Sequence, residues 1–451
     1  MKRKIGSVLG HALAGRMPAL PASLTNFPDT TLEEVTVMGM SVGEYETGVR
    51  VEEEAARARA GGAQGGDGLS LLPAAARLRS LDVFRGMTVA GMILVNNPGT
   101  WGAIYSPLKH AEWHGWTPTD LVFPFFLFIV GVSITLALSR RAEAGGGKRD
   151  LYVKIVRRSA IIFGLGLFLT AFPFWDFTRN TFIDLSTLRL SGVLNRIAVC
   201  YLFAALIFLK TDWRKQAYIF GALLVAYWAV LTFIPAPGFA AGDMSKEGSI
   251  ASHVDRVLLG RHMWSGGKGV YEPEGILSTL GALATTFAGM LTGHLLRSRR
   301  TDAEKVSAMF VAGAACVAAG WAWNYWHPVN KPLWTSSYVL FTAGMGLQLL
   351  AVCYWLIDVK GYRRWSVPFA VYGTNALAVF FLTGVCAKLL GIIKLPGADG
   401  KDVSLHGAIF RNLFLSWASP VNASLAFAVC FVLFWLGVMW LLYRRNIFIK
   451  V

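Results

Sequence analysis

The sequence predicts an all-α polytopic membrane protein with about ten transmembrane helices. Of its 451 residues, 54% are hydrophobic and only 16% are charged, whereas a soluble globular protein carries about a quarter charged residues. Apolar runs recur along the chain, each near the ~20 residues that a helix needs to cross a bilayer. Lys and Arg gather at alternate ends of these runs. This bias predicts that both termini lie in the cytosol (N-in and C-in).

The first 76 residues differ from the rest of the chain. They hold an acidic cluster at 52–54 and a glycine-rich run at 61–68, with no sustained hydrophobic period. This composition predicts a disordered cytosolic tail over 1–76, followed by a transmembrane domain over 77–451. The tail carries 7 basic and 9 acidic residues, so the positive excess behind the chain's net charge of +16 lies entirely in the membrane domain. Because that excess lies at the predicted cytosolic helix ends, we expect no nucleic-acid partner.

Ten segments fit transmembrane helices. The first is interrupted by Arg85, Asn96 and Asn97, and it is included because the alternating charge pattern needs an even number of spans. The tryptophans gather in or beside the loops that are poor in Lys and Arg, as an interfacial aromatic belt does. The predicted spans are 82–98, 119–139, 154–172, 191–210, 216–234, 276–296, 305–326, 335–357, 367–391 and 421–443.

Several sites of other kinds are not indicated. The five cysteines lie inside apolar runs, without a C-x-x-C pair or metal-ligand spacing, so we expect neither a disulfide framework nor a metal site. The sequence has no phosphate-binding loop of the Walker type. This disfavours an ATP-driven pump.

The loop after the first span is rich in groups that can do chemistry. It contains His110, Glu112, Trp113 and His114, and Asp120 follows at the mouth of the next helix. A histidine beside a carboxylate at the water–membrane boundary can act as a general base, because imidazoles titrate near neutral pH. The alternative reading is an interfacial histidine that only hydrogen-bonds a neighbouring loop.

Other polar residues fall into two groups. One group lies at the predicted outer helix ends, where a half-buried sugar pocket would need charged and amide groups: Arg189, Glu272, Glu274, Asn330 and Lys331. For Glu272 and Glu274 the alternative is the first turn of a helix. The second group lies within or at the ends of spans, where polar side chains are costly and usually face a bundle interior or a wet cavity. Its members are Arg85, Asn96, Asn97, Asp120, Arg196 and Asn375. Helix–helix hydrogen bonding is the alternative for each asparagine.

Two long segments carry a family resemblance. Residues 77–99, RLRSLDVFRGMTVAGMILVNNPG, and 109–131, KHAEWHGWTPTDLVFPFFLFIVG, resemble the transmembrane part of the heparan-α-glucosaminide N-acetyltransferase family, bacterial homologues included. Further segments agree in the same order: 189–197, 272–279, 328–339, 357–361 and 372–377. Two positions depart from the family pattern: asparagine is found in place of His114, and glutamine is common in place of Asn195. These departures leave the substrate scope open.

The resemblance implies transmembrane acetylation. Cytosolic acetyl-CoA would supply an acetyl group to the amine of a glucosamine-type sugar on the periplasmic side of a bacterial inner membrane. It ties His110 to catalysis and places Asn96 near the thioester. We expect the acceptor to meet Trp113, His114, Arg189, Glu272, Glu274, Asn330 and Lys331. We expect acetyl-CoA to meet Arg85, Asn97, Arg196 and Asn375, with no metal. A homodimer in the lipid bilayer is compatible with the sequence.

These inferences combine into a mechanism. His110 would take a proton from the amine, Asn96 or Asn97 would donate to the thioester oxygen, and Asp120 or Glu112 would orient the imidazole. Direct transfer is favoured over an acetyl-His intermediate, because a long pantetheine arm could carry the acetyl group across the bundle. Two other functions stay open: a secondary transporter for an amino sugar or muropeptide, and an O-acyltransferase for envelope polysaccharide.

Overall fold

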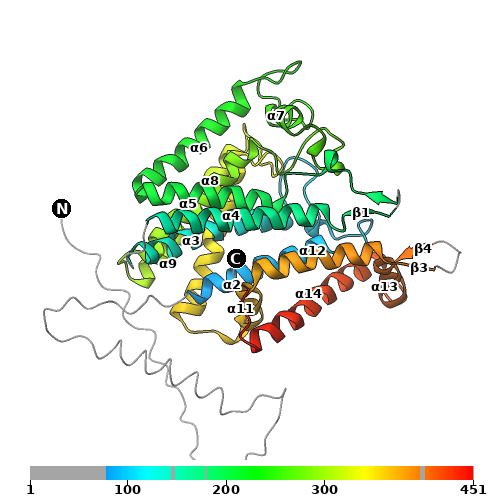
Figure 1. Cartoon of the computed structure of the whole chain (residues 1–451). Coiled ribbons are helices and arrows are strands. Elements are labelled where there is room, and N and C mark those ends of the chain that lie inside the picture. Colours follow the sequence, from blue (N-terminus) through cyan, green and yellow to red (C-terminus); the bar gives the residue numbers. More distant parts are fainter. Residues whose placement is uncertain (1–77, 144–147, 178–179, 397–401, 450–451) are drawn as a thin grey trace, which may run out of the picture. The chain divides into compact units, whose positions relative to one another are not determined.

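The structure is a computed structural model that describes residues 78–143, 148–177, 180–396 and 402–449. The predicted tail of residues 1–76 lies outside the described residues. The all-α prediction is confirmed, and each of the ten predicted segments is helical (Figure 1). The long helices are α2 (Arg79–Asn96), α3 (Val122–Glu143), α4 (Lys148–Ala171), α5 (Val193–Lys210), α6 (Trp213–Phe233), α8 (Ser278–Arg297), α9 (Asp302–Trp323), α10 (Ser336–Cys353), the pair α11 (Val367–Thr374) and α12 (Ala376–Ile392), and α14 (Pro420–Arg444).

Fewer than ten of these helices are apolar enough to be candidate spans. In the described part of the chain, seven helices have the length and hydropathy to cross a membrane, and the bent pair α11–α12 would be an eighth. α2 and α4 do not qualify, because each carries at least three charged residues in any stretch of bilayer length. In α2 two of these charges, Asp82 and Arg85, form an ion pair of 3.0 Å. Pairing lowers the cost of charges away from water.

The predicted span 367–391 is not one straight helix. It breaks at Asn375, and the axes of the two parts differ by 72°. The buried Asn375 amide donates to the carbonyl of Ile447 (3.0 Å) and accepts from the amide of Ile449 (2.8 Å). The side chain that was predicted to bind acetyl-CoA therefore ties the break to the segment after α14.

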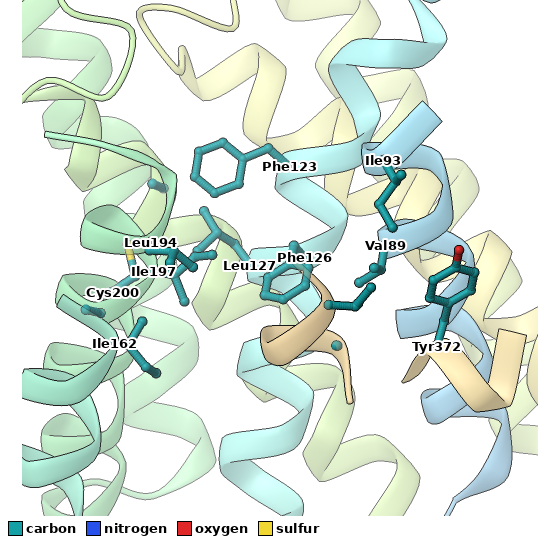
Figure 2. Packing of buried hydrophobic residues seen from close by; sticks show 14 of the residues in the cluster. Val89, Ile93, Phe123, Phe126, Leu127, Ile162, Leu194, Ile197, Cys200 and Tyr372 are labelled. Atoms are coloured by element: carbon teal, nitrogen blue, oxygen red, sulfur yellow. The ribbon is translucent and has the colours of Figure 1, made fainter. Parts of the chain in front are cut away.

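Glycines allow the central helices to approach closely. A Cβ on Gly86 of α2 would lie 1.7 Å from the carbonyl oxygen of Phe369 in α11, and one on Gly373 of α11 would lie 1.8 Å from that of Asp82. Gly131 of α3 meets Thr286 of α8 in the same way. Small residues at such crossings are typical of helix packing in membranes. Around them lies an apolar core, and Figure 2 shows side chains of α2, α3, α4, α5 and α11 that share it.

Short elements join the long helices. They are η1 (Ser106–Leu108), η2 (Pro118–Leu121), the antiparallel pair β1 (Trp175–Asp176) and β2 (Thr181–Phe182), η3 (Leu185–Thr187), α7 (Ile250–Leu259), η4 (Gly260–His262), η5 (Ser265–Gly267), a π-helical end of α10 (Tyr354–Val359), η7 (Arg364–Ser366), the antiparallel pair β3 (Lys394–Pro396) and β4 (Asp402–Ser404), α13 (Leu405–Ile409) and a π-helical turn (Phe410–Phe414). We use the name loop end for the connections 97–117, 172–192, 234–277 and 324–335. These connections meet, because Gly115 donates to the Val329 carbonyl and Leu190 to that of His262.

Candidate active site

His110 and Asp120 form a close pair at the loop end. Nδ1 of His110 lies 2.6 Å from Oδ1 of Asp120. The other carboxylate oxygen accepts from the backbone amides of Ala111 and Thr117, both at 3.0 Å, and from the Thr117 hydroxyl. Thr117 and Asp120 make the capping box of η2, so the local sequence itself fixes the carboxylate. The Asp120 side chain is 1% exposed and that of His110 is 49% exposed. A buried, fixed carboxylate thus holds an accessible imidazole.

Lys331 joins this pair from the connection between α9 and α10. Its Nζ lies 3.1 Å from Nδ1 of His110 and 3.4 Å from Oδ1 of Asp120. Burial lowers the pKa of Lys331, while Asp120 and Glu274 act in the opposite direction. The predicted acceptor residue Lys331 and the predicted catalytic pair therefore form one cluster.

Arg189 bridges the two glutamates that were predicted with it. Its Nε donates to Oε2 of Glu272 (3.0 Å), and its Nη2 donates to both Glu272 and Glu274. Glu272 also accepts from the backbone amide of Trp264 (2.7 Å). Burial raises the pKa of Glu272. The pKa of Glu274 is lowered against burial by three cations, which are Arg189, Arg196 and Lys331.

The cluster therefore extends from His110 to Glu272. Lys331 is electrostatically coupled to both Asp120 and Glu274, and Glu274 shares Arg189 with Glu272. In this site one carboxyl group has a raised pKa and another a lowered pKa, and an imidazole lies nearby. Such a site can bind a cationic amine and accept a proton from it. Across the described residues, no group of three His, Cys, Asp or Glu side chains is arranged to hold a metal ion.

Two aromatic residues predicted for the acceptor border the cluster. The indole of Trp113 donates to the Met244 carbonyl (2.7 Å), and its ring packs edge-on against Tyr271 at 5.0 Å. His114 is exposed, and partial burial lowers its pKa. Trp113 thus connects the loop that carries His110 to Tyr271, the residue before Glu272.

Asn330 has a different environment from the other predicted acceptor residues. It is fully buried, its amide donates to the Trp113 carbonyl (3.0 Å), and its oxygen accepts from the Leu333 amide (2.8 Å). Its nitrogen also lies 3.3 Å from Nδ1 of His114. The structure therefore gives Asn330 the role of fixing the Lys331 loop against the His110 loop.

The four residues predicted to bind acetyl-CoA do not form one cluster. Arg85 lies in α2 and donates to Asp82, to the Gly373 carbonyl (3.3 Å) and to the Ser133 hydroxyl (3.0 Å). Asn375 lies at the α11–α12 break, as described above. Asn97 follows the last residue of α2, and its amide donates to the Ile93 carbonyl of its own helix (2.8 Å).

Arg196 lies next to the loop end. It lies in the first turn of α5, donates to the Gly275 carbonyl (2.9 Å) and to the Ser278 hydroxyl, and stacks over the Trp334 ring at 5.2 Å. It thus lies beside the predicted acceptor residues. Asn96, the predicted oxyanion donor, is the last residue of α2 and is exposed. Its side chain has no hydrogen-bond partner among the described residues.

The sequence analysis missed two residues of this region. Tyr338 of α10 donates from its hydroxyl to the Asp120 carbonyl and so ties η2 to α10. Asp255 of α7 accepts from the Ile276 amide (2.7 Å), directly after the acidic turn. One feature of the sequence could have identified Asp255. This residue lies on the buried face of a short amphipathic helix that begins after the N-cap Ser249, between the predicted spans 216–234 and 276–296.

Comparisons with known proteins point to one group of enzymes. Residues 77–244 match the family model described as heparan-alpha-glucosaminide N-acetyltransferase, catalytic. The chain is 29% identical to the human heparan-alpha-glucosaminide N-acetyltransferase over 446 residues, which cover 85% of this chain and 61% of the human protein. It is also 29% identical to the mouse protein of that name over 364 residues, which cover 67% of this chain and 53% of the mouse protein.

The chain thus spans between about half and three fifths of the length of these relatives. The matched segment 77–244 begins just before α2 and contains His110, Asp120 and Arg189. It contains three of the segments that carry the resemblance in the sequence, 77–99, 109–131 and 189–197. The resemblance to the heparan-alpha-glucosaminide N-acetyltransferase family that the sequence motifs indicated is therefore confirmed.

Proposed function

We propose that this chain is a membrane acetyltransferase that moves the acetyl group of acetyl-CoA to the amine of a glucosamine-type sugar, with His110 as general base. The names of the relatives support the reaction class and the sugar. The observation that carries the role of His110 is its 2.6 Å contact with the buried Asp120. A fixed carboxylate orients an imidazole for proton transfer, and about half of this imidazole stays accessible.

The proposed step is a direct transfer. The amine nitrogen attacks the thioester carbon, a C–N bond forms and the C–S bond breaks. His110 takes the proton that the amine loses, and the CoA sulfur leaves as a thiolate that is then protonated. Bringing both substrates together at one site makes this step effectively intramolecular.

Of the two asparagines at the end of α2, Asn96 is the better candidate for donating to the thioester oxygen. Adjacent helical residues point to different faces, so at most one of them lines a given site. The Asn97 amide is engaged with its own helix, whereas the exposed Asn96 amide is available to a ligand. A donor to the developing oxyanion is commonly worth about 10²–10³ in kcat.

The acceptor amine would bind between the carboxylates of Glu274 and Asp120, on the side where Arg189, Glu272 and Trp113 lie. The acidic and aromatic groups suit a cationic amino sugar. Arg85 remains our candidate for the CoA nucleotide at the opposite end of α2, in addition to its hydrogen bonds within the bundle. Periplasmic sidedness, a bacterial inner membrane and a homodimer stay predictions.

The test is an acetyl-transfer assay in detergent. Purified protein is incubated with labelled acetyl-CoA and glucosamine, and we expect labelled N-acetylglucosamine from the wild type and almost none from His110→Ala and His110→Asn. His253→Ala, a histidine of α7 outside the cluster, should retain activity. Near-wild-type transfer by both His110 variants would contradict the proposed base. An acetylated protein that accumulates without acceptor would instead support the two-step route.

The same assay separates the enzyme from the transporter alternative. A secondary transporter moves its substrate across a membrane and makes no new covalent bond. Product formation in detergent, where no compartments exist, therefore excludes pure transport. Transfer to a hydroxyl of a sugar that has no free amine would favour the O-acyltransferase.

A further inference from the structure

The short helix α7 is anchored beside the cluster. Ser249 caps its first turn by accepting from the Ala251 amide, and Gly260, with a φ of 53°, ends it. Arg256 fixes it to the loop end by donating to the carbonyls of Val270 and Glu247, both at 2.9 Å. Figure 1 shows α7 beside α6, against which its Ala251 packs. The helix therefore has a defined position from which a side chain can act on its neighbours.

Asp255 is the buried acid of this helix, only 2% exposed. Its Oδ1 accepts from the Ile276 amide at 2.7 Å. Its carboxylate also lies against Gly275, where an added Cβ would be 1.9 Å from Oδ2. A glycine is thus needed at position 275 for the carboxylate to reach the backbone that follows the acidic turn.

A second buried side chain binds the same peptide. Arg196 donates to the Gly275 carbonyl at 2.9 Å and to the Ser278 hydroxyl. Asp255 therefore holds the amide of Ile276, and Arg196 holds the carbonyl of Gly275, which belong to one peptide unit. Both groups are buried, and the guanidinium of Arg196 is charged, which strengthens its hydrogen bond to the carbonyl.

The two glutamates of the cluster lie immediately before this peptide. Glu272 and Glu274 are one to three residues from Gly275, so a shift of the peptide moves both carboxylates and their shared partner Arg189. The position of a binding group matters at the scale of an ångström. In the part of the chain that the structure describes, no other side chain of α7 donates a hydrogen bond to this turn or accepts one from it.

We propose that Asp255 is a positioning residue for the acceptor: through the Gly275–Ile276 peptide it fixes the Glu272–Glu274 turn so that the Glu274 carboxylate receives the ammonium of the amino sugar. This inference rests on the proposed function. It adds that acceptor affinity depends on a residue of α7 that does not itself touch the acceptor. The binding of acetyl-CoA should be independent of it.

The test compares three variants with a control on the same helix. Asp255→Ala removes the acceptor of the Ile276 amide, and Gly275→Ala forces a Cβ into the carboxylate. Asp255→Asn keeps an oxygen for the amide. The control is Ser252→Ala, one turn earlier, where the hydroxyl is buried and has no hydrogen-bond partner among the described residues.

We expect Asp255→Ala and Gly275→Ala to raise the KM for glucosamine at least tenfold, with the KM for acetyl-CoA within twofold of wild type. Asp255→Asn should recover most of the acceptor affinity, and Ser252→Ala should match the wild type. Hydrogen exchange gives a readout that does not need activity: the peptide containing 272–278 should exchange faster in Asp255→Ala than in Ser252→Ala.

The proposal is overturned if Asp255→Ala leaves both the acceptor KM and the exchange of 272–278 at the level of Ser252→Ala. It is also overturned if both KM values rise together with a lower thermal midpoint, because that pattern indicates general destabilisation. Faster exchange in a protein whose wild type acetylates no amino sugar would support the positioning of the turn and contradict the proposed function instead.

Discussion

The carboxylate of Asp120 is almost completely buried, yet it lies 2.6 Å from an imidazole, that of His110, which is half exposed. The two residues are ten positions apart, and the capping box of η2 fixes the carboxylate independently of the histidine. This arrangement separates the tasks: Asp120 sets the orientation, and His110 meets the substrate.

Asp120→Asn should therefore lower kcat strongly with little effect on the acceptor KM. The asparagine amide has the same shape as the carboxylate, but its NH2 group donates where Nδ1–H of the imidazole needs an acceptor. The ring therefore loses its favoured orientation. We expect a loss of about 10²–10⁴ in kcat, the usual contribution of positioned acid–base catalysis. Initial rates at saturating acetyl-CoA measure it, with Asp243→Asn at the loop end as control. A kcat within threefold of wild type would show that Asp120 does not orient the base.

Arg189→Lys should weaken acceptor binding. An ammonium cannot reproduce the fork that binds Glu272 and Glu274 together, so the two carboxylates lose their common partner. We expect the acceptor KM to rise about tenfold, which corresponds to about 1.4 kcal/mol. The exposed Arg261→Lys is the matched control. Equal KM values for the two variants would remove Arg189 from the acceptor site.

Asp255 predicts a dependence of stability on pH. Burial raises its pKa to about 7; the Ile276 amide, Arg196 and Arg256 act against that rise, and Glu272 adds to it. Tyr227 of α6 also interacts electrostatically with the carboxyl group. Because the folded protein binds this proton more tightly than the unfolded chain, the group favours folding most below about pH 4. That contribution is lost as the pH rises through 7.

The measurement is a thermal unfolding series from pH 4 to 8 in detergent. We expect Asp255→Asn, which carries no titrating group here, to gain stability relative to the wild type as the pH rises. The difference should grow by at most about 1.4 kcal/mol for each pH unit. Parallel curves for the two proteins across this range would contradict a raised pKa.

Much of the fold could be predicted from the sequence, because hydropathy and charge report directly on bilayer burial. The ten helices follow from this signal, although α2 and α4 carry more charge than a lipid-facing helix tolerates. The break at Asn375 could not be predicted, because its cause is a contact with Ile447 and Ile449, more than 70 residues away. A local apolar pattern contains no information about such a partner.

The site was predictable where its residues are close in sequence. His110 and Asp120 are neighbours of one loop, whereas the pairing of Arg189 with Glu272 spans 83 positions and depends on how the connections meet at the loop end. The predicted acetyl-CoA set was drawn from polar residues within or at the ends of the predicted spans, with Arg85 supported by the family resemblance. The structure distributes it between both ends of the bundle and places Arg196 beside the acceptor residues.

The crossing of α2 and α11 gives the last prediction, on stability. Gly86→Ala and Gly373→Ala should each destabilise the bundle, since a Cβ would lie 1.7 or 1.8 Å from a backbone oxygen of the facing helix and neither backbone can yield locally. Overpacking of this kind typically costs about 1–3 kcal/mol. The controls are Gly164→Ala in α4 and Gly437→Ala in α14, where an added Cβ meets nothing within 4 Å. Thermal unfolding in detergent should lower the midpoint only for the first two variants. If all four variants unfold together with the wild type, the two helices do not depend on this close approach, and the position of Arg85 beside Gly373 would need another cause.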